Sequence, residues 1–348
     1  MVLRLLLAGL LLFSSNGQLY AKTYTLKFAT LMPTGTSWTK LLDEWVKEVE
    51  EKSEGRLKFK MYPGGVMGDE PDVLRKIRKR QLHGGMFTGY GIGRIYSPAR
   101  VLEVPFLFKN TDESDYVRTQ MMPELEAGFS ESGFELLGWP EVGFIHFFSK
   151  RPITSMDDIR KLNIWLWQGD PLGEALFTAA AIDPVPLSVI DVYTQLSARH
   201  GSIDTVYISS FGAIALQWYT KLNYASRIPF TNAIGGLVVS NRFYNKLPQD
   251  LQQLLKTTGK KLGDDIRLRA REENEKSLAI LEKNGIEFMF DWSDVDMNDM
   301  LEIRDLAASH LEDTNYIPAA TFARAQKLVT DFREQHKLDN QAANPSAP

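Results

Sequence analysis

Two tryptophans in alternation, Trp165 and Trp167, stand directly before the polar turn Gln168-Gly169-Asp170-Pro171. Alternation with a period of two places both indole rings on the same side of a strand. Large aromatic faces at a strand end can bind a small molecule by burying its apolar surface. Tryptophan is more often a core residue than a site residue, and it is the position before the turn that favours a cleft wall.

The elements around these tryptophans predict a β-α-β unit. A helical pattern runs over 172–181, an extended segment over 183–187, and a further helix ends near Gly201 before a second strand. In open α/β sheets, ligands bind beyond the carboxyl ends of strands. Tyr207, at the end of that second strand, is therefore a candidate ligand contact, with lobe packing as the alternative. Trp218 follows on a helical pattern, and a core role is the alternative for it.

Two loops of the N-terminal half are further candidates. The loop from Thr34 to Trp38 offers hydroxyls and backbone N–H groups at a helix start, which suits a polar head group, and Ser37 is either part of this site or a plain N-cap. Thr88 and Tyr90 flank Gly89 at another strand end, where glycine lets a ligand approach the backbone.

Trp139 and Glu141 follow the predicted strand 134–138, and we expect them to close the edge of the cleft. The rest of the pattern does not indicate an enzyme. The five histidines show no paired metal spacing, and there is no Gly-x-Ser-x-Gly elbow. Residues 89–93 read Gly-Tyr-Gly-Ile-Gly, which is not the dinucleotide-binding spacing. We expect binding without turnover, no cofactor and no metal.

An ordered series of motifs resembles a known family. Residues 158–210, Tyr62-Pro63-Gly64-Gly65, Val104-Pro105-Phe106-Leu107-Phe108 and Pro184-Val185-Pro186 are similar to the DctP-type periplasmic substrate-binding subunits of TRAP transporters. The resemblance implies an α/β, two-lobe periplasmic binding protein fold with a hinge and a long helix that spans the lobes. It also implies a receptor that closes on a small molecule and delivers it to the TRAP membrane permease subunits.

This sequence departs from the family pattern at one informative position. Trp165 stands where the family usually has the arginine that pairs with a substrate carboxylate. In this it resembles an arginine-lacking subgroup that works beside a tetratricopeptide-repeat lipoprotein and takes hydrophobic ligands. The resemblance thus implies an apolar or amphipathic ligand, such as a lipid or fatty acid.

Two alternatives stay open. One is a conventional organic-acid receptor that supplies its cation from elsewhere, for instance Arg94 or Arg100. The other is an exported scaffold subunit whose cleft is vestigial.

The N-terminus predicts export to the periplasm. Arg4 precedes an apolar run over 5–13 and the cleavage site Leu19-Tyr20-Ala21, which together predict a signal peptide over 1–21. The chain has no cysteine and a net charge of −4, so it forms no disulfide and gives no indication of nucleic-acid binding.

Strand patterns over 24–30, 84–88 and 237–240 alternate with helical patterns, and this alternation predicts two lobes that exchange segments. We expect lobe I to comprise 22–145 plus about 235–272, and lobe II to comprise 146–234 plus about 273–335. Residues 340–348 are expected to form a disordered tail.

Overall fold

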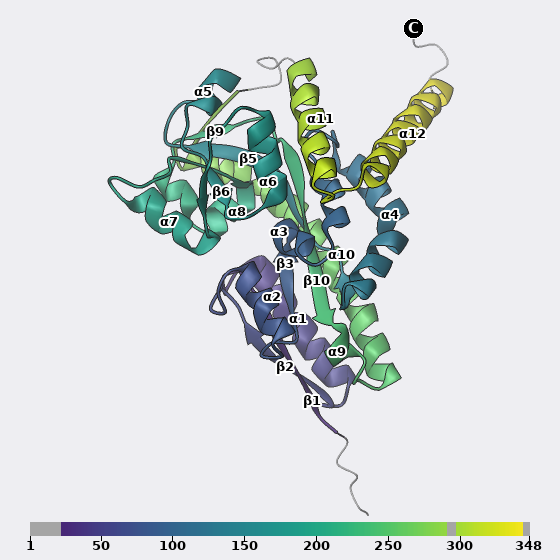
Figure 1. Ribbon diagram of the computed structural model, residues 1–348. Coiled ribbons are helices and arrows are strands. Elements are labelled where there is room, and N and C mark those ends of the chain that lie inside the picture. Colours follow the sequence, from purple (N-terminus) through teal and green to yellow (C-terminus); the bar gives the residue numbers. More distant parts are fainter. Residues whose placement is uncertain (1–21, 291–296, 344–348) are drawn as a thin grey trace, which may run out of the picture.

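The computed structural model describes residues 22–290 and 297–343 of the chain. Its main feature is a mixed nine-stranded sheet with the order β11-β9-β5-β10-β3-β1-β2, in which β4 also pairs with β10 and β8 with β5. Two bodies are visible in Figure 1. Lobe I holds β1 to β4 and the end of β10, and lobe II holds β5, β8, β9, β11 and the start of β10.

Lobe I is built on three parallel strands. The strand β1 (Tyr24–Thr30) lies between β2 (Leu57–Tyr62) and β3 (Gly84–Thr88). The helices α1 (Ser37–Lys52) and α2 (Glu70–Arg78) follow β1 and β2 in the chain. In α1, four side chains at helical spacing face the core: Trp38, Leu42, Trp45 and Val49. The residue that caps α1 is Thr36, whose hydroxyl accepts from the backbone N–H of Thr39, and Ser37 is the first residue of the helix.

Lobe II is built on β5 (Glu141–Ser149), which pairs antiparallel with β8 (Thr205–Ser209) and β9 (Tyr224–Ser226). The short strand β11 (Glu287–Met289) adds to β9. The strands β6 (Trp165–Trp167) and β7 (Val185–Leu187) form a separate parallel pair. The helix α6 (Pro171–Ala179) connects them in the chain, and α7 (Val189–Ser197) follows β7. The predicted second strand is β8, and it meets the segment before β6 through one parallel bridge between Ile164 and Thr205. The segment predicted only as extended, 183–187, forms the strand β7, which is the partner of β6.

Two elements run through both lobes. The strand β10 (Thr231–Ser240) pairs with β5 near Thr231 and with β3 and β4 (Phe134–Gly138) beyond Gly235. The sequence predicted only its last four residues. The 35-residue helix α10 (Gln249–Lys283) packs on α1 and β4 of lobe I and on β5 and α8 (Ser210–Ala215) of lobe II. Figure 1 shows it passing behind both bodies. The residue boundaries proposed for the lobes stay a prediction.

The remaining elements cover the sheet and join the lobes. α11 packs on α6, and α12 packs on α4. The helix α12 continues to Ala343, so the predicted tail from Asn340 begins inside a helix and its last five residues lie outside the described part. In the described ranges, no helix is long and apolar enough to cross a membrane. The bounds are α3 Gly89–Gly93, η1 Ser97–Glu103, α4 Thr111–Glu131, α5 Met156–Arg160, η2 Trp218–Lys221, α9 Asn241–Tyr244, α11 Met297–Asp313 and α12 Ala319–Ala343.

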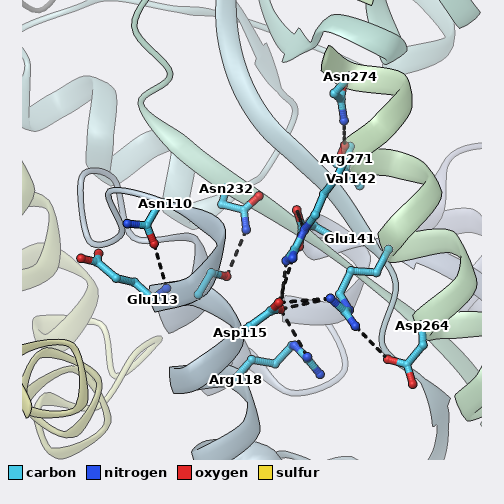
Figure 2. A network of polar contacts seen from close by, with 12 residues as sticks. Asn110, Glu113, Asp115, Arg118, Glu141, Val142, Asn232, Asp264, Arg271 and Asn274 are labelled. Carbon is cyan, nitrogen blue, oxygen red and sulfur yellow. Dashed lines mark hydrogen bonds and ion pairs between the residues drawn. The ribbon is translucent and has the colours of Figure 1, made fainter. Parts of the chain in front are cut away.

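A network of ion pairs fixes α10 to the start of β5, where the chain passes from lobe I to lobe II (Figure 2). Arg271 of α10 donates through Nη1 and Nη2 to both carboxylate oxygens of Asp115 in α4, at 2.8 and 2.9 Å. The same guanidinium donates to Oε2 of Glu141 at 2.6 Å. Asn274, one turn further along α10, donates to the carbonyl of Val142 at 2.8 Å. Glu141 is therefore part of the junction between the lobes.

Candidate functional site

A cavity of about 480 Å³ lies between the lobes. Lobe I contributes the loop after β1, the start of α3 and the helix η1, while lobe II contributes β6, α6, α7, β8 and α8. Most of the lining is apolar or aromatic. Among the described lining residues, the charged side chains are Arg100, Glu103 and Asp170.

Trp165 belongs to the wall of this cavity and to the core behind it. Its ring stacks on Tyr207 at 5.1 Å between centroids and meets the edge of Trp218 at 5.4 Å. Its Nε1–H donates to the carbonyl of Leu187 at 3.0 Å. Since only 2% of its surface is exposed, Trp165 shapes the cavity chiefly as a packed wall.

Trp167 and Tyr90 bring the two lobes together. Their rings lie 4.8 Å apart, and the Tyr90 hydroxyl donates to the carbonyl of Gln168 at 2.7 Å. Burial raises the pKa of Tyr90 to about 12, so it stays a neutral donor at physiological pH. Trp167 Nε1–H donates to the carboxylate of Asp69 at 3.0 Å.

Asp69 accepts hydrogen bonds from residues of both lobes. It caps α2 by accepting from the N–H of Glu70 at 2.7 Å. The hydroxyl of Ser188, at the start of α7, donates to it at 2.5 Å. Together with the bond from Trp167, these contacts tie the start of α2 to lobe II.

A buried ion cluster forms the polar end of the cavity. Arg100 donates from Nη1 and Nη2 to the two oxygens of Asp170 at 2.8 and 3.1 Å, and its Nε lies 2.5 Å from Oε2 of Glu103. The other oxygen of Glu103 accepts from the N–H of Ile234 at 2.7 Å. Burial raises the pKa of Glu103, while Arg100 opposes this shift.

Most of the predicted site residues lie on one cavity. Its lining includes Trp38, Thr88, Tyr90, Trp165, Trp167, Tyr207 and Trp218. Whether they contact the ligand stays a prediction.

Four predicted residues lie elsewhere. The loop after β1 lines the cavity through Leu31, Met32, Pro33 and Thr36, and neither Thr34 nor Ser37 belongs to the lining. Trp139 packs edge-on against Phe129 in the core of lobe I. Glu141 is paired with Arg271. These four side chains are not part of the cavity lining.

Position 89 requires glycine for a different reason from the one that the sequence suggested. A Cβ atom there would lie 2.0 Å from a carboxylate oxygen of Glu103. The absence of a Cβ atom at Gly89 thus leaves room for the side chain of Glu103 at the floor of the cleft.

Sequence reasoning missed Asp69 and Glu103, and it treated Asp170 only as part of a turn. A signal was present for two of them, since Asp before Glu-Pro and Asp before Pro are both typical of helix N-caps. No pattern in the sequence indicates that these carboxylates reach across to the other lobe. Among the described residues, no group of histidines and carboxylates is arranged to hold a metal ion.

The sequence profile of bacterial extracellular solute-binding proteins, family 7 (DctP), matches residues 28–302. The chain is 22% identical over 267 residues to the 2,3-diketo-L-gulonate-binding periplasmic protein YiaO of Escherichia coli K12. That alignment covers 74% of this chain and 79% of the relative.

Solved structures show the same fold. A TRAP periplasmic solute-binding protein of Pseudomonas putida F1 with bound D-glucuronate superposes with a TM-score of 0.78 at 22% identity, covering 88% of this chain and 97% of the other. A TRAP periplasmic solute-binding protein of Sulfitobacter sp. NAS-14.1 with bound β-D-galacturonate gives a TM-score of 0.75 at 20% identity, covering 89% and 100%. The two-lobe fold expected from the sequence is thereby confirmed.

The family and these neighbours are solute-binding proteins. With its matched profile, its two-lobe fold and its cavity between the lobes, this chain belongs to the DctP family of extracellular solute-binding proteins, the receptors of TRAP transporters.

Proposed function

We propose that this receptor captures a small apolar or amphipathic molecule between its lobes and delivers it to a TRAP permease. The observation that carries the proposal is the lining of the cavity, whose wall is formed by Trp165, Tyr207 and Trp218. Apolar ligand surface gains about 25 cal/mol per Å² when it is buried against such a wall. A carboxylate left without a partner there loses several kcal/mol, in the range of about 2–7 for a polar group.

A second candidate is a receptor for carboxylates, and the relatives favour it. YiaO is named for 2,3-diketo-L-gulonate, and the two neighbouring structures hold D-glucuronate and β-D-galacturonate. Among the described residues that line the cavity, Arg100 is the one basic side chain that could serve as the cation. Arg94 is not part of the lining, and its Nη2 donates to the carbonyl of Gly169 at 3.0 Å. The carboxylate candidate therefore requires Arg100 to exchange a protein partner for the ligand.

Calorimetry with two probes separates these candidates. We expect protein that has been unfolded, stripped of bound lipid and refolded to bind decanol, and to bind D-glucuronate weakly or not at all. The reason is that the alkyl chain fits the aromatic wall, whereas the hexuronate brings a carboxylate and several hydroxyls to it. Tight binding of D-glucuronate without binding of decanol would establish the carboxylate receptor instead. Binding of neither probe would favour the scaffold with a vestigial cleft.

The signal peptide over 1–21 lies outside the described residues, and periplasmic location is supported by the family. A tetratricopeptide-repeat lipoprotein as partner stays a prediction from the subgroup resemblance. Binding without turnover is supported by the family and its neighbours.

A further inference from the structure

The guanidinium of Arg100 is occupied by the protein itself. Both of its terminal nitrogens donate to Asp170, one to each carboxylate oxygen, and its Nε faces Glu103. The side chain of Arg100 is 4% exposed, and that of Asp170 is 7% exposed. Two parallel N–H···O bonds from an arginine fork are the arrangement by which arginine binds a carboxylate with geometric specificity. Here the carboxylate is a side chain of the same chain.

The partners of this bidentate pair come from opposite sides of the cavity. Arg100 lies in η1 of lobe I, and Asp170 is the N-cap of α6 in lobe II. A ligand stabilises the closed state of a two-lobe receptor by contacting both lobes at once. In this chain a carboxylate of the protein itself, that of Asp170, bridges the lobes.

The charge of the cluster opposes a second carboxylate. With all three groups ionised, one cation and two anions give the polar end of the cavity a net charge of −1. Protonation of Glu103, towards which burial moves it, gives a net charge of zero. Neither state offers a net positive charge, and the described lining contains no other basic side chain. An incoming carboxylate would have to displace Asp170 and leave it buried without its cation, which is costly.

We propose that Asp170 is a built-in substitute for a ligand carboxylate, which makes the cleft select against acids and in favour of ligands whose polar end is uncharged, such as an alcohol. The inference rests on the apolar ligand of the proposed function and narrows its head group. Asp170 is thereby a specificity-determining residue. A buried ion pair adds little net stability compared with apolar packing, so selection of the ligand is a better account of this cluster than stability.

A pair of probes with the same chain, decanol and decanoate, tests this by calorimetry at neutral pH. We expect wild type to bind decanol at least about tenfold more tightly than decanoate, because only the acid competes with Asp170. Asp170→Asn keeps the size and the helix cap but removes the anion. It should tighten the binding of decanoate about tenfold relative to that of decanol.

The matched control is Asp204→Asn. Asp204 also pairs with an arginine, Arg151 at 2.8 Å, and also accepts from a backbone N–H, that of Asn163 at 2.9 Å, but it is not part of the cavity lining. It should leave both affinities as in wild type. Adding Arg100→Gln to Asp170→Asn should abolish the gain for decanoate, which a purely structural role of Asp170 would not predict.

Each outcome of the calorimetry tests either the role of Asp170 or the proposed function. The inference is overturned if wild type binds decanoate as tightly as decanol, or if folded Asp170→Asn gains nothing for decanoate. Should Asp170→Asn fail to fold, Asp170→Ser, which also caps helices, carries the same expectation. If wild type binds neither probe, the proposed function fails first. Equal binding of both probes leaves the apolar function standing and removes the role of Asp170.

Discussion

Trp165→Ala is expected to lose both stability and ligand affinity, whereas Trp45→Ala should lose stability alone. The two residues are matched, because each is 2% exposed and each donates its indole N–H at 3.0 Å, Trp165 to Leu187 and Trp45 to Thr258. Only Trp165 lines the cavity. Truncating a buried tryptophan costs about 3–5 kcal/mol of unfolding free energy, so we expect losses of this size in both variants.

Calorimetry with decanol then isolates the role in binding. The loss of one large aromatic contact should weaken the affinity of Trp165→Ala by about 1–3 kcal/mol, with that of Trp45→Ala unchanged. Trp165→Phe and Trp45→Phe repeat the comparison at lower cost in stability if the alanine variants do not fold. Trp165→Arg should weaken decanol further, because it places a cation against an apolar chain. Equal affinities in the Trp165 and Trp45 variants would show that Trp165 is a core residue without a role in binding.

Arg271→Met is expected to lower the free energy of unfolding by about 3 kcal/mol, because it leaves a buried carboxylate without its cation. Glu141, whose side chain is 6% exposed, has Arg271 as its ion-pair partner in the network of Figure 2. Asp115 is affected less, since Arg267 also donates to it at 3.1 Å. Urea denaturation with tryptophan fluorescence measures the difference.

The control on the same helix is Lys276→Met. Lys276 pairs with Glu272 at 2.5 Å, and its side chain is 62% exposed. Exposed helix pairs contribute about 0.3–0.5 kcal/mol, so this variant should stay close to wild type. Arg271→Lys should fall between the two, because it keeps the charge but loses the fork that reaches both carboxylates. A loss in Arg271→Met no larger than in Lys276→Met would mean that this network does not hold the junction of the lobes.

The sequence predicted elements whose signal is local. Strands such as β1 and β3 appear at their predicted residues because alternation and turn residues determine them along the chain. The start of β10 was missed because it contains Gly235-Gly236. The structure explains Gly236, where a Cβ atom would lie 2.2 Å from Ile92. The pairing of β10 with strands of both lobes is a tertiary contact, and the local sequence pattern does not encode it.

The candidate site shows the same difference between features with a local sequence signal and features that depend on tertiary contacts. Trp165 and Trp167 reach the cavity from the short strand β6, as is typical of residues at strand ends in α/β folds. Tyr207 also lines the cavity, but it lies in the middle of β8 and not at the strand end that the sequence suggested. The bridges between the lobes were not predicted, because Arg100 and Asp170 are 70 residues apart and Asp69 and Trp167 are 98 apart. Thr34, Ser37, Trp139 and Glu141 were placed at the cleft on chain proximity, which does not determine the direction of a side chain.

The central claim is that the cleft takes an apolar or amphipathic ligand. Native mass spectrometry of receptor purified from the periplasm of its own host, followed by solvent extraction of the bound molecule, tests it most directly. The account predicts a bound mass that passes into organic solvent and carries an uncharged polar end. A bound sugar acid or other small polar carboxylate would contradict it and would identify this chain as a conventional acid receptor.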